Sequence, residues 1–353
     1  AVGIACCILI MVWVQNELNF DRFNNKADRI YRLYHELTLN SQTRIAPVTS
    51  APIAPALRQS FPEVENAVRI SPIGNTTVKY GEREFREDQV FFADNAIFNI
   101  FSLPMTHGNP KSALAAAYSA VITEKTAQRY FGADNPLGKI LKFVDGREYA
   151  ITGVIKNVPS NSHISFDILC SFATWISENK QEAEMWGRIG LSTYILLAPG
   201  TDLKSFTAKM ERLVYEKIGK DLKSVGGSLM IYLQPLTRIH LHSNFEFDNA
   251  NIGDIKIVFL FSGIALFILF IACINFINLA TARFANRALE VGLKKTMGAS
   301  RGSLVRQFLG ETFFVTFLAV LLACFFTIFA LPLLSSISGQ EFSSAILLQP
   351  LYL

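Results

Sequence analysis

The sequence has few cysteines and few charged residues for its length. Only five cysteines occur among 353 residues, and Cys170 is the one outside apolar runs; the others are Cys6, Cys7, Cys273 and Cys324. A framework of disulfide bonds within the chain is therefore excluded, and we expect the cysteines to act as small buried apolar residues. Charged residues make up 18% of the chain and the net charge is +4. Because basic residues gather only in one short segment, no nucleic-acid partner is predicted.

The sequence also lacks the motifs of common catalytic and nucleotide-binding sites. No G-x-S-x-G or H-E-x-x-H pattern occurs, and no spacing of Ser, His and Asp selects a triad. The nearest approach to a phosphate-binding loop, residues 132–140, has one residue too many and contains Pro136. It also places Ile140 where Mg²⁺ would need a hydroxyl. We therefore expect a non-catalytic chain with no cofactor of its own, in which Gly132 ends a helix.

One histidine pair has a spacing that can begin a metal site. His240 and His242 would point to the same side of a strand, and Glu246 and Asp248 follow them closely. No Cys, His or acidic partner stands in an obvious matching position. We therefore predict no metal and favour a surface pair of histidines close to the membrane.

Two long uncharged runs, Ile257–Ala282 and Thr312–Gly339, stand out against this background. Each spans about 26 residues or more, which as a helix rising about 1.5 Å per residue crosses a hydrocarbon core about 30 Å thick. Both are predicted transmembrane helices. Asn275 and Asn278 in the first run should hydrogen-bond to other helices, with the lining of a conduit as the alternative. Pro332 predicts a kink or exit in the second run.

A short basic segment links the two runs. It contains two acidic residues, Glu290 and Glu311, and six basic residues: Arg283, Arg287, Lys294, Lys295, Arg301 and Arg306. Short loops rich in Lys and Arg remain in the cytoplasm. The segment is therefore predicted to lie inside the cell, and the long region from Gln15 to Lys256 outside.

The same segment carries the signals of two helices joined by a sharp bend. Residues at helical spacing predict a helix that leaves the membrane with an apolar stripe: Phe284, Ala288, Val291 and Lys295. Gly298 can end that helix in the left-handed conformation, and the Ser300 hydroxyl can cap the next helix. We predict a rigid elbow over Met297–Ser300 that can receive force from a partner. The alternative is an ordinary loop held to anionic lipid by its basic residues.

Short strands and helices alternate through the region before the apolar runs. The predicted strands are near 30–33 and at 64–70, 76–80, 84–92, 120–123, 139–143, 149–158, 192–197 and 229–233. The predicted helices are at about 55–61, 96–101, 124–131 and 203–218, and the predicted tight turns are at 80–82 and 145–146. The pattern is α+β in two subdomains, the second beginning near Ser119, and their boundary can be discontinuous.

Both ends of the sequence are apolar. The opening stretch AVGIACCILIMVWV has no initiator methionine and suggests the outer end of a truncated first membrane helix, with a signal-peptide core as the alternative. The chain closes on AILLQPLYL. We expect a fragment that lacks a piece at its N-terminus and further membrane helices at its C-terminus.

Three stretches give the chain a family resemblance. RALEVGLKKTMGASRGSLVRQFLGET resembles the signature of FtsX/MacB-type permease subunits of bacterial ABC transporters, where an E-[VI]-G-x-[RK]-[KR]-x-x-G-A-[ST] run follows the second membrane helix. ACCILIMVWVQNELNFDRFNNKADRIYRL resembles the first helix and the entry to the exported domain of these proteins. SAVITEKTAQRYFGADNPLGKILKF is similar to the middle of the MacB-like periplasmic domain. The resemblance covers essentially the whole chain.

The resemblance implies an α+β membrane protein with transmembrane helices and a large extracytoplasmic mixed α/β domain of two subdomains. The expected order is a truncated transmembrane helix at 1–15, a MacB-like periplasmic domain at 16–255 with an inserted subdomain at about 119–190, a second transmembrane helix at 256–282, a cytoplasmic coupling segment at 283–311, a third transmembrane helix at 312–339 and the start of a truncated C-terminal part at 340–353. Residues from about 256 to 353 would form the FtsX-like permease domain.

The resemblance also implies a function. The chain would be a permease subunit in the bacterial inner membrane, with its large domain in the periplasm. It would couple ATP hydrolysis by a cytoplasmic ABC ATPase to movement of that domain, for efflux or for export of lipoproteins or peptides. ATP and Mg²⁺ would bind to the ATPase. The alternative is a mechanotransmitting regulator of signalling or cell-wall remodelling that moves no cargo. A homodimer or pseudo-dimer and a periplasmic or outer-membrane partner are further expectations.

Finally, the resemblance implies which residues contact the ATPase. They lie in the coupling segment: Glu290, Gly292, Lys294, Lys295, Gly298, Ala299 and Ser300. Lys294 and Lys295 stand where Arg is frequent in the family. Lysine keeps the charge of arginine but loses its bidentate fork, so the expected contact is one of charge rather than of geometry.

Overall fold

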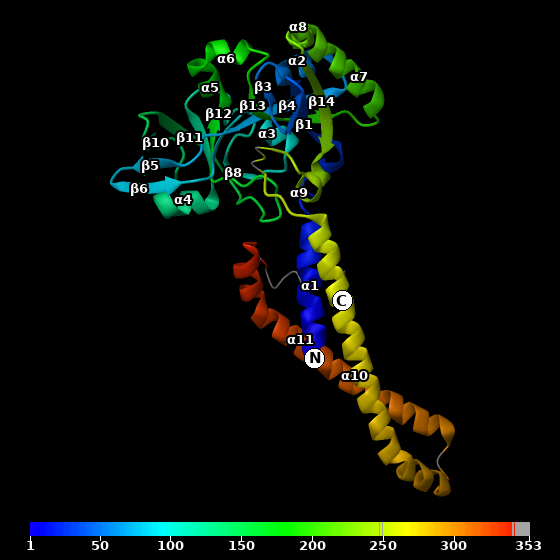
Figure 1. Cartoon of the computed structure of the whole chain (residues 1–353). Coiled ribbons are helices and arrows are strands. Elements are labelled where there is room, and N and C mark those ends of the chain that lie inside the picture. The colour runs from blue at the N-terminus through cyan, green and yellow to red at the C-terminus, as the bar shows by residue number, and fades with distance from the viewer. Residues whose placement is uncertain (247, 249, 299, 341, 343–353) are drawn as a thin grey trace. The chain divides into compact units, whose positions relative to one another are not determined.

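The computed structural model describes residues 1–246, 248, 250–298, 300–340 and 342. The chain divides into two compact units, which Figure 1 colours along the sequence. The first, here called the helical unit, consists of Ala1–Leu18 and the chain from Asp254 onward. The second, here called the α/β unit, is Asn19–Gly253.

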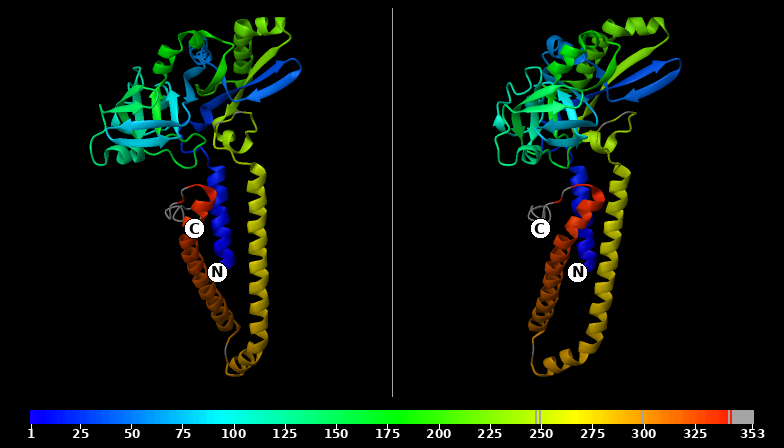
Figure 2. Two further views of the ribbon diagram at one scale, coloured as in Figure 1. Left: turned by 60° about the vertical axis from the view of Figure 1, so that its left-hand side comes forward. Right: turned by 90° about the vertical axis from the view of Figure 1, so that its left-hand side faces the viewer.

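Three long helices form the helical unit: α1 (Val2–Leu18), α10 (Ile255–Thr296) and α11 (Arg301–Ser338). Helix α1 packs against both others, as both views of Figure 2 show. A Cβ atom on Gly3 would lie 3.1 Å from the Cβ of Ala272, so glycine permits a close approach of α1 to α10. Ile255–Ala282 and α11 are long and apolar enough to cross a membrane. Both predicted transmembrane helices are therefore present, and each continues into the linking segment.

The two asparagines and the proline of these helices can now be placed. Asn275 and Asn278 are exposed on α10, and neither hydrogen-bonds to another helix within the described part of the chain, so their contact with other helices stays a prediction. Of the kink or exit predicted at Pro332, the exit is wrong, because α11 continues to Ser338 and stops at Gly339 with φ of 68°; the kink stays a prediction. A left-handed glycine, not the proline, ends this helix.

A single continuous sheet runs through the α/β unit. Its strands are β1 (Ile30–Leu39), β2 (Gln42–Ala46), β3 (Thr49–Ser50), β4 (Val64–Pro72), β5 (Thr76–Tyr80), β6 (Arg83–Glu87), β7 (Val90–Ala93), β8 (Met105–Gly108), β9 (Ser119–Thr123), β10 (Ile140–Phe143), β11 (Glu148–Ile155), β12 (Ile168–Ser171), β13 (Ile189–Leu197) and β14 (Ser228–Pro235). The order is β14-β1-β13-β4-β7-β12-β9-β11-β10-β5-β6. Strands β2, β3 and β8 pair with β1, β13 and β11. Among the described strands, β9–β11 and β7–β12 are the only parallel pairs, so antiparallel pairing dominates.

Short helices complete the α/β unit. They are α2 (Ile53–Ser60), α3 (Ile97–Ile100), α4 (Glu124–Phe131), α5 (Phe172–Glu178), α6 (Lys180–Glu184), α7 (Leu203–Val214), α8 (Lys220–Ser224) and α9 (Ile239–His242). Local signals explain α4, because the Thr123 hydroxyl accepts the Thr126 N–H and Gly132 follows with φ of 63°. The predicted hairpin turn is confirmed at Gly81, between β5 and β6.

Several predicted elements need correction. The strand predicted at 84–92 is two strands, β6 and β7, since its two halves pair with different neighbours. Helix α2 begins at Ile53, because the first turn of a helix tolerates Pro55. The helix predicted at 203–218 ends as α-helix at Val214 and continues as a π-helical turn over Tyr215–Gly219.

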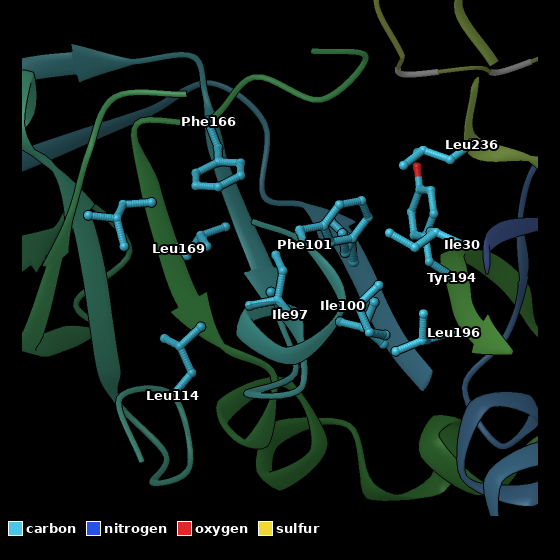
Figure 3. Close-up of a cluster of buried hydrophobic side chains, with 14 of the residues drawn as sticks. Ile30, Ile97, Ile100, Phe101, Leu114, Phe166, Leu169, Tyr194, Leu196 and Leu236 are labelled. Atoms are coloured by element: carbon cyan, nitrogen blue, oxygen red, sulfur yellow. The ribbon is translucent and has the colours of Figure 1, made fainter. Parts of the chain in front are cut away.

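Three clusters of buried apolar side chains support the sheet. One contains Ile97, Ile100 and Phe101, packed against residues of β1, β13 and the β14–α9 connection (Figure 3). A second packs α4 against β9–β12 and the β5 hairpin, and a third packs α2 and α7 against β1, β4 and β13. The β5–β6 hairpin, which precedes residue 119, thus shares a core with β9–β12, which follow it. The predicted limits of the inserted subdomain, 119–190, stay a prediction.

Cys170 should report global unfolding of the α/β unit. Its side chain is fully buried on β12, and burial raises the pKa of the thiol, so little reactive thiolate forms in the folded protein. We expect Cys170 to react with a thiol reagent only under denaturing conditions. The control is Val144→Cys, placed at a position that is 68% exposed, which should react at once. Rapid labelling of Cys170 without denaturant would contradict this burial.

Candidate functional site

The elbow between α10 and α11 is the candidate functional site, and its backbone follows the prediction. The Met297 N–H donates to the Leu293 carbonyl and the Gly298 N–H to the Lys295 carbonyl, at 3.1 Å each. Gly298 has φ of 89°, a value that glycine adopts readily. The Ser300 side chain then accepts the Ser303 N–H at 3.3 Å and begins α11. The helix stop and the cap are both confirmed.

The charged side chains of the elbow have two different surroundings. The Lys294 ammonium lies 2.9 Å from Glu290 Oε1 on its own helix and 3.2 Å from Gln307 Oε1 on α11. It therefore ties the two arms of the elbow together. Lys295 is exposed and makes no hydrogen bond or ion pair with any described residue. Of the two lysines that the sequence analysis treated alike, Lys294 stabilises the elbow and Lys295 is open to a partner.

Apolar side chains share this surface, which the sequence analysis did not single out. Met297 is 81% exposed and Leu293 65% exposed, one helical turn apart and beside the lysines. Val305 and Leu309 are also largely exposed on α11, whereas Leu304 is buried. The sequence pattern that could have revealed them is apolar residues at helical spacing inside a basic segment. The elbow thus presents a mixed basic and apolar surface.

The other predicted contact residues make fewer contacts within the chain or lie outside its described part. Glu290 is half-exposed and forms the ion pair with Lys294. Gly292 lies within α10, where an added Cβ would meet nothing within 4 Å, so packing inside the chain does not require glycine there. Ala299 lies outside the described residues. The structure therefore pairs Glu290 with Lys294 and places Gly298 and Ser300 at the bend, whereas the predicted role of Gly292 stays a prediction.

A matched pair of glycine variants tests the elbow. Gly298→Ala should cost about 1–2 kcal/mol locally because a Cβ disfavours the left-handed conformation. Gly302→Ala, at a helical position with open space around it, should instead stabilise α11 slightly. We expect faster hydrogen exchange of the amides at residues 293–303 in Gly298→Ala alone, by about fivefold or more. Equal exchange in the two variants would show that the left-handed glycine does not hold the bend.

The two alternative sites considered in the sequence have structural roles. His240 and His242 belong to helix α9, not to a strand, and His240 is buried rather than on the surface. Its Nδ1 lies 2.7 Å from the Asn251 carbonyl oxygen. Among the described residues, no group of three His, Cys, Asp or Glu side chains could hold a metal ion. In residues 132–140, Gly132 and Gly138 have positive φ and Lys139 pairs with Asp134, which fits a turn.

Comparison with known proteins decides the family. Residues 1–213 match the MacB-like periplasmic core domain, and residues 262–353 match the FtsX-like permease C-terminal domain. The chain belongs to the FtsX/MacB-type permease family. The resemblance seen in the sequence is thereby confirmed, and so is the α+β membrane-protein fold class. The elbow of this permease lies inside the FtsX-like region, between the two helices of membrane length.

Individual relatives of the permease agree with this membership. The uncharacterized ABC transporter permease YknZ of Bacillus subtilis is 23% identical over 251 residues, which cover 70% of this chain and 58% of YknZ. The chain thus spans less than two thirds of that relative. A solved domain assigned to a permease of Porphyromonas gingivalis is 23% identical, with a TM-score of 0.54, and the match covers 60% of this chain and 91% of that domain. That likeness shows the fold of the α/β unit.

Proposed function

We propose that this permease is the membrane subunit of an ABC transporter, with its elbow in the cytoplasm and its α/β unit outside the bacterial inner membrane. A separate ATPase would bind the elbow. The observation that carries the proposal is the pair of local signals at Gly298 and Ser300, a left-handed glycine and a helix cap, between two membrane-length helices and beside an exposed lysine. A stiff joint at the end of a long helix can transmit displacement, whereas a loose loop absorbs it.

The side chains of the elbow indicate what kind of ATPase surface would bind it. Lys295 supplies an exposed positive charge, and Leu293 and Met297 supply apolar contact area beside it. A partner groove with an apolar floor and acidic rim would complement all three side chains. The N-terminal end of α11 adds a partial positive charge from its backbone N–H groups. The expected contact is therefore with an acidic, partly apolar groove of the ATPase.

ATP would act through the partner's two conformations. If the closed ATPase dimer binds the elbow differently from the open one, ATP shifts the position of the elbow, and the permease shifts the ATPase equilibrium in return. Helices α1 and α10 both connect directly to the α/β unit in sequence, so that unit would move with them. ATP and Mg²⁺ would bind only to the ATPase.

We propose efflux or export of cargo such as a peptide or lipoprotein as the output of this movement. The alternative is a mechanical signal that moves no cargo. Accumulation of cargo in cells that lack the permease separates the two, because a signalling device would not change it.

Topology is the first test of the proposal. In a chain without its native cysteines, Met297→Cys should react with a membrane-impermeant maleimide only after the membrane is opened. Val144→Cys, in the α/β unit, should react in intact spheroplasts. If Met297→Cys reacts from outside, the elbow cannot meet a cytoplasmic ATPase and the proposal is wrong.

A further inference from the structure

Two chain segments connect the α/β unit to the helices that we place in the membrane. Asn19–Asp21 follow the last residue of α1, and Asn251–Gly253 precede the cap of α10. Within the α/β unit, both segments join a buried polar network. We call its five ionisable members the base network: Asp21, Arg32, His163, Tyr194 and Asp248.

The first connection is made through Asp21 and His163. Asp21 Oδ1 lies 2.8 Å from His163 Nδ1 and accepts the His163 backbone N–H at 3.2 Å. Both side chains are 1% exposed. A carboxylate removed from water needs such partners, and Asp21 holds φ of 60°, so tertiary contacts impose its conformation. The segment after α1 is thus bound to a loop that is 142 residues away in sequence.

The network continues from His163 into the sheet. Its Nε2 lies 2.9 Å from the Tyr194 hydroxyl on β13. Burial raises the pKa of the Tyr194 phenol, which therefore stays protonated. The His163 ring thus lies within hydrogen-bond distance of both the Asp21 carboxylate and this hydroxyl. Tyr194 is in turn the direct cross-strand neighbour of Arg32 on β1.

Arg32 makes the second connection. Its Nη1 and Nη2 donate to the two carboxylate oxygens of Asp248 at 2.8 Å each, with 1% and 2% of the side chains exposed. Its Nε and Nη2 also donate to Gln234 Oε1, and Nη2 donates to Ser243 Oγ. The fork geometry of this pair is specific in direction as well as strong. Asp248, three residues before Asn251, is therefore bound to Arg32 of β1, which also donates to Gln234 of β14.

Two histidines, His163 and His240, contact both connecting segments. The Asn251 N–H donates to the His163 carbonyl at 2.8 Å, and the Gly253 N–H donates to the His240 carbonyl at 2.8 Å. The ring of Phe20 stacks on the ring of His240, with centroids 3.3 Å apart and planes 2° apart. Both segments therefore meet at the same two histidines.

We propose that the base network makes the two connections of the α/β unit move as one piece, so that its members are positioning residues for force transmission. This inference rests on the proposed function. Without the network, a displacement of α1 or α10 would bend a flexible segment instead of turning the sheet. With it, either helix acts on β1 and β13, two neighbouring strands near the β14 end of the sheet.

The test compares two buried tyrosines in the full-length permease with its ATPase. Tyr194→Phe removes the hydroxyl that joins His163 to the sheet. Tyr130→Phe removes a buried hydroxyl that donates to Glu87 Oε1 at 2.6 Å in the α4 region, away from both connections. We expect Tyr194→Phe to lower the ATP-dependent output by about fivefold or more, and Tyr130→Phe to leave it nearly unchanged. Their melting temperatures should fall by similar amounts.

A double-mutant cycle with the elbow excludes a purely structural role. Helix α10 has 42 residues and is about 63 Å long, so independent effects at its two ends should add. If Lys295→Ala and Tyr194→Phe act along one path, their effects on output should be less than additive. Additive effects would overturn this inference and leave the proposed function standing. The same holds if both tyrosine variants give equal output while elbow variants still lower it. If elbow variants also leave output unchanged, the proposed function fails and this inference falls with it.

Discussion

Charge reversal at the elbow, Lys294→Glu with Lys295→Glu, is expected to abolish stimulation of the partner ATPase while the permease still inserts into the membrane. The change replaces two positive charges by two negative ones at a surface that should face acidic groups, and like charges in contact cost several kcal/mol. It also removes the Lys294 bond to Gln307, which joins α10 to α11. We expect a loss of about tenfold or more in permease-dependent ATP hydrolysis.

Two matched variants separate charge from folding in this experiment. Lys294→Arg with Lys295→Arg keeps both charges and should retain coupling. Lys256→Glu reverses an exposed lysine at the opposite end of α10, where a negative charge suits the helix N-terminus, and should have little effect. Insertion is checked with the Met297→Cys labelling. If the double reversal leaves ATP hydrolysis unchanged, Lys294 and Lys295 are not ATPase contacts.

Asp248→Asn is expected to cause the largest loss of stability of any single substitution considered for this permease. The amide leaves the Arg32 guanidinium buried without its counter-charge, a situation that costs about 3–5 kcal/mol in proteins. The free energy of unfolding of the α/β unit should fall by that amount. The measurement is the denaturant midpoint at which Cys170 becomes reactive.

Two further variants test the cause of this loss. Glu65→Gln breaks the Arg29 ion pair, which is about one-third exposed, and should cost less than about 1 kcal/mol. The double replacement Arg32→Met with Asp248→Leu should recover much of the lost stability, since it removes both buried charges. It should not recover coupling if the base network transmits force. A cost for Asp248→Asn as small as that of Glu65→Gln would show that the pair is not buried in solution.

The elbow could be predicted because its determinants are local. Gly298 and Ser300 act through their own backbone and neighbouring N–H groups, so four or five residues are enough to specify the bend. Apolar runs likewise predict membrane helices, because insertion depends on the composition of one continuous segment. The family motif added the expectation that this segment contacts an ATPase. The different surroundings of Lys294 and Lys295 were hidden, because Gln307 lies on the next helix.

The histidine pair shows where local rules fail. A spacing of two residues suits one face of a strand, but His240 and His242 lie on a short helix, and His240 is buried under the ring of Phe20. The contact that buries His240 comes from Phe20, at the opposite end of the unit in sequence. The same holds for the predicted strand at 84–92, which divides because β6 pairs with β5 while β7 pairs with β4 and β12.

The sequence by itself determined the two membrane-length helices, the elbow between them and the alternating α+β pattern, since each depends on residues within a few turns of one another. Only the tertiary structure decided the base network and the single sheet that carries it. Arg32 and Asp248 are 216 residues apart, and Asp21 and His163 are 142 apart. No local pattern encodes such partners. They meet because burial of the apolar clusters brings β1 and β13 together, and a buried charge then requires a partner there.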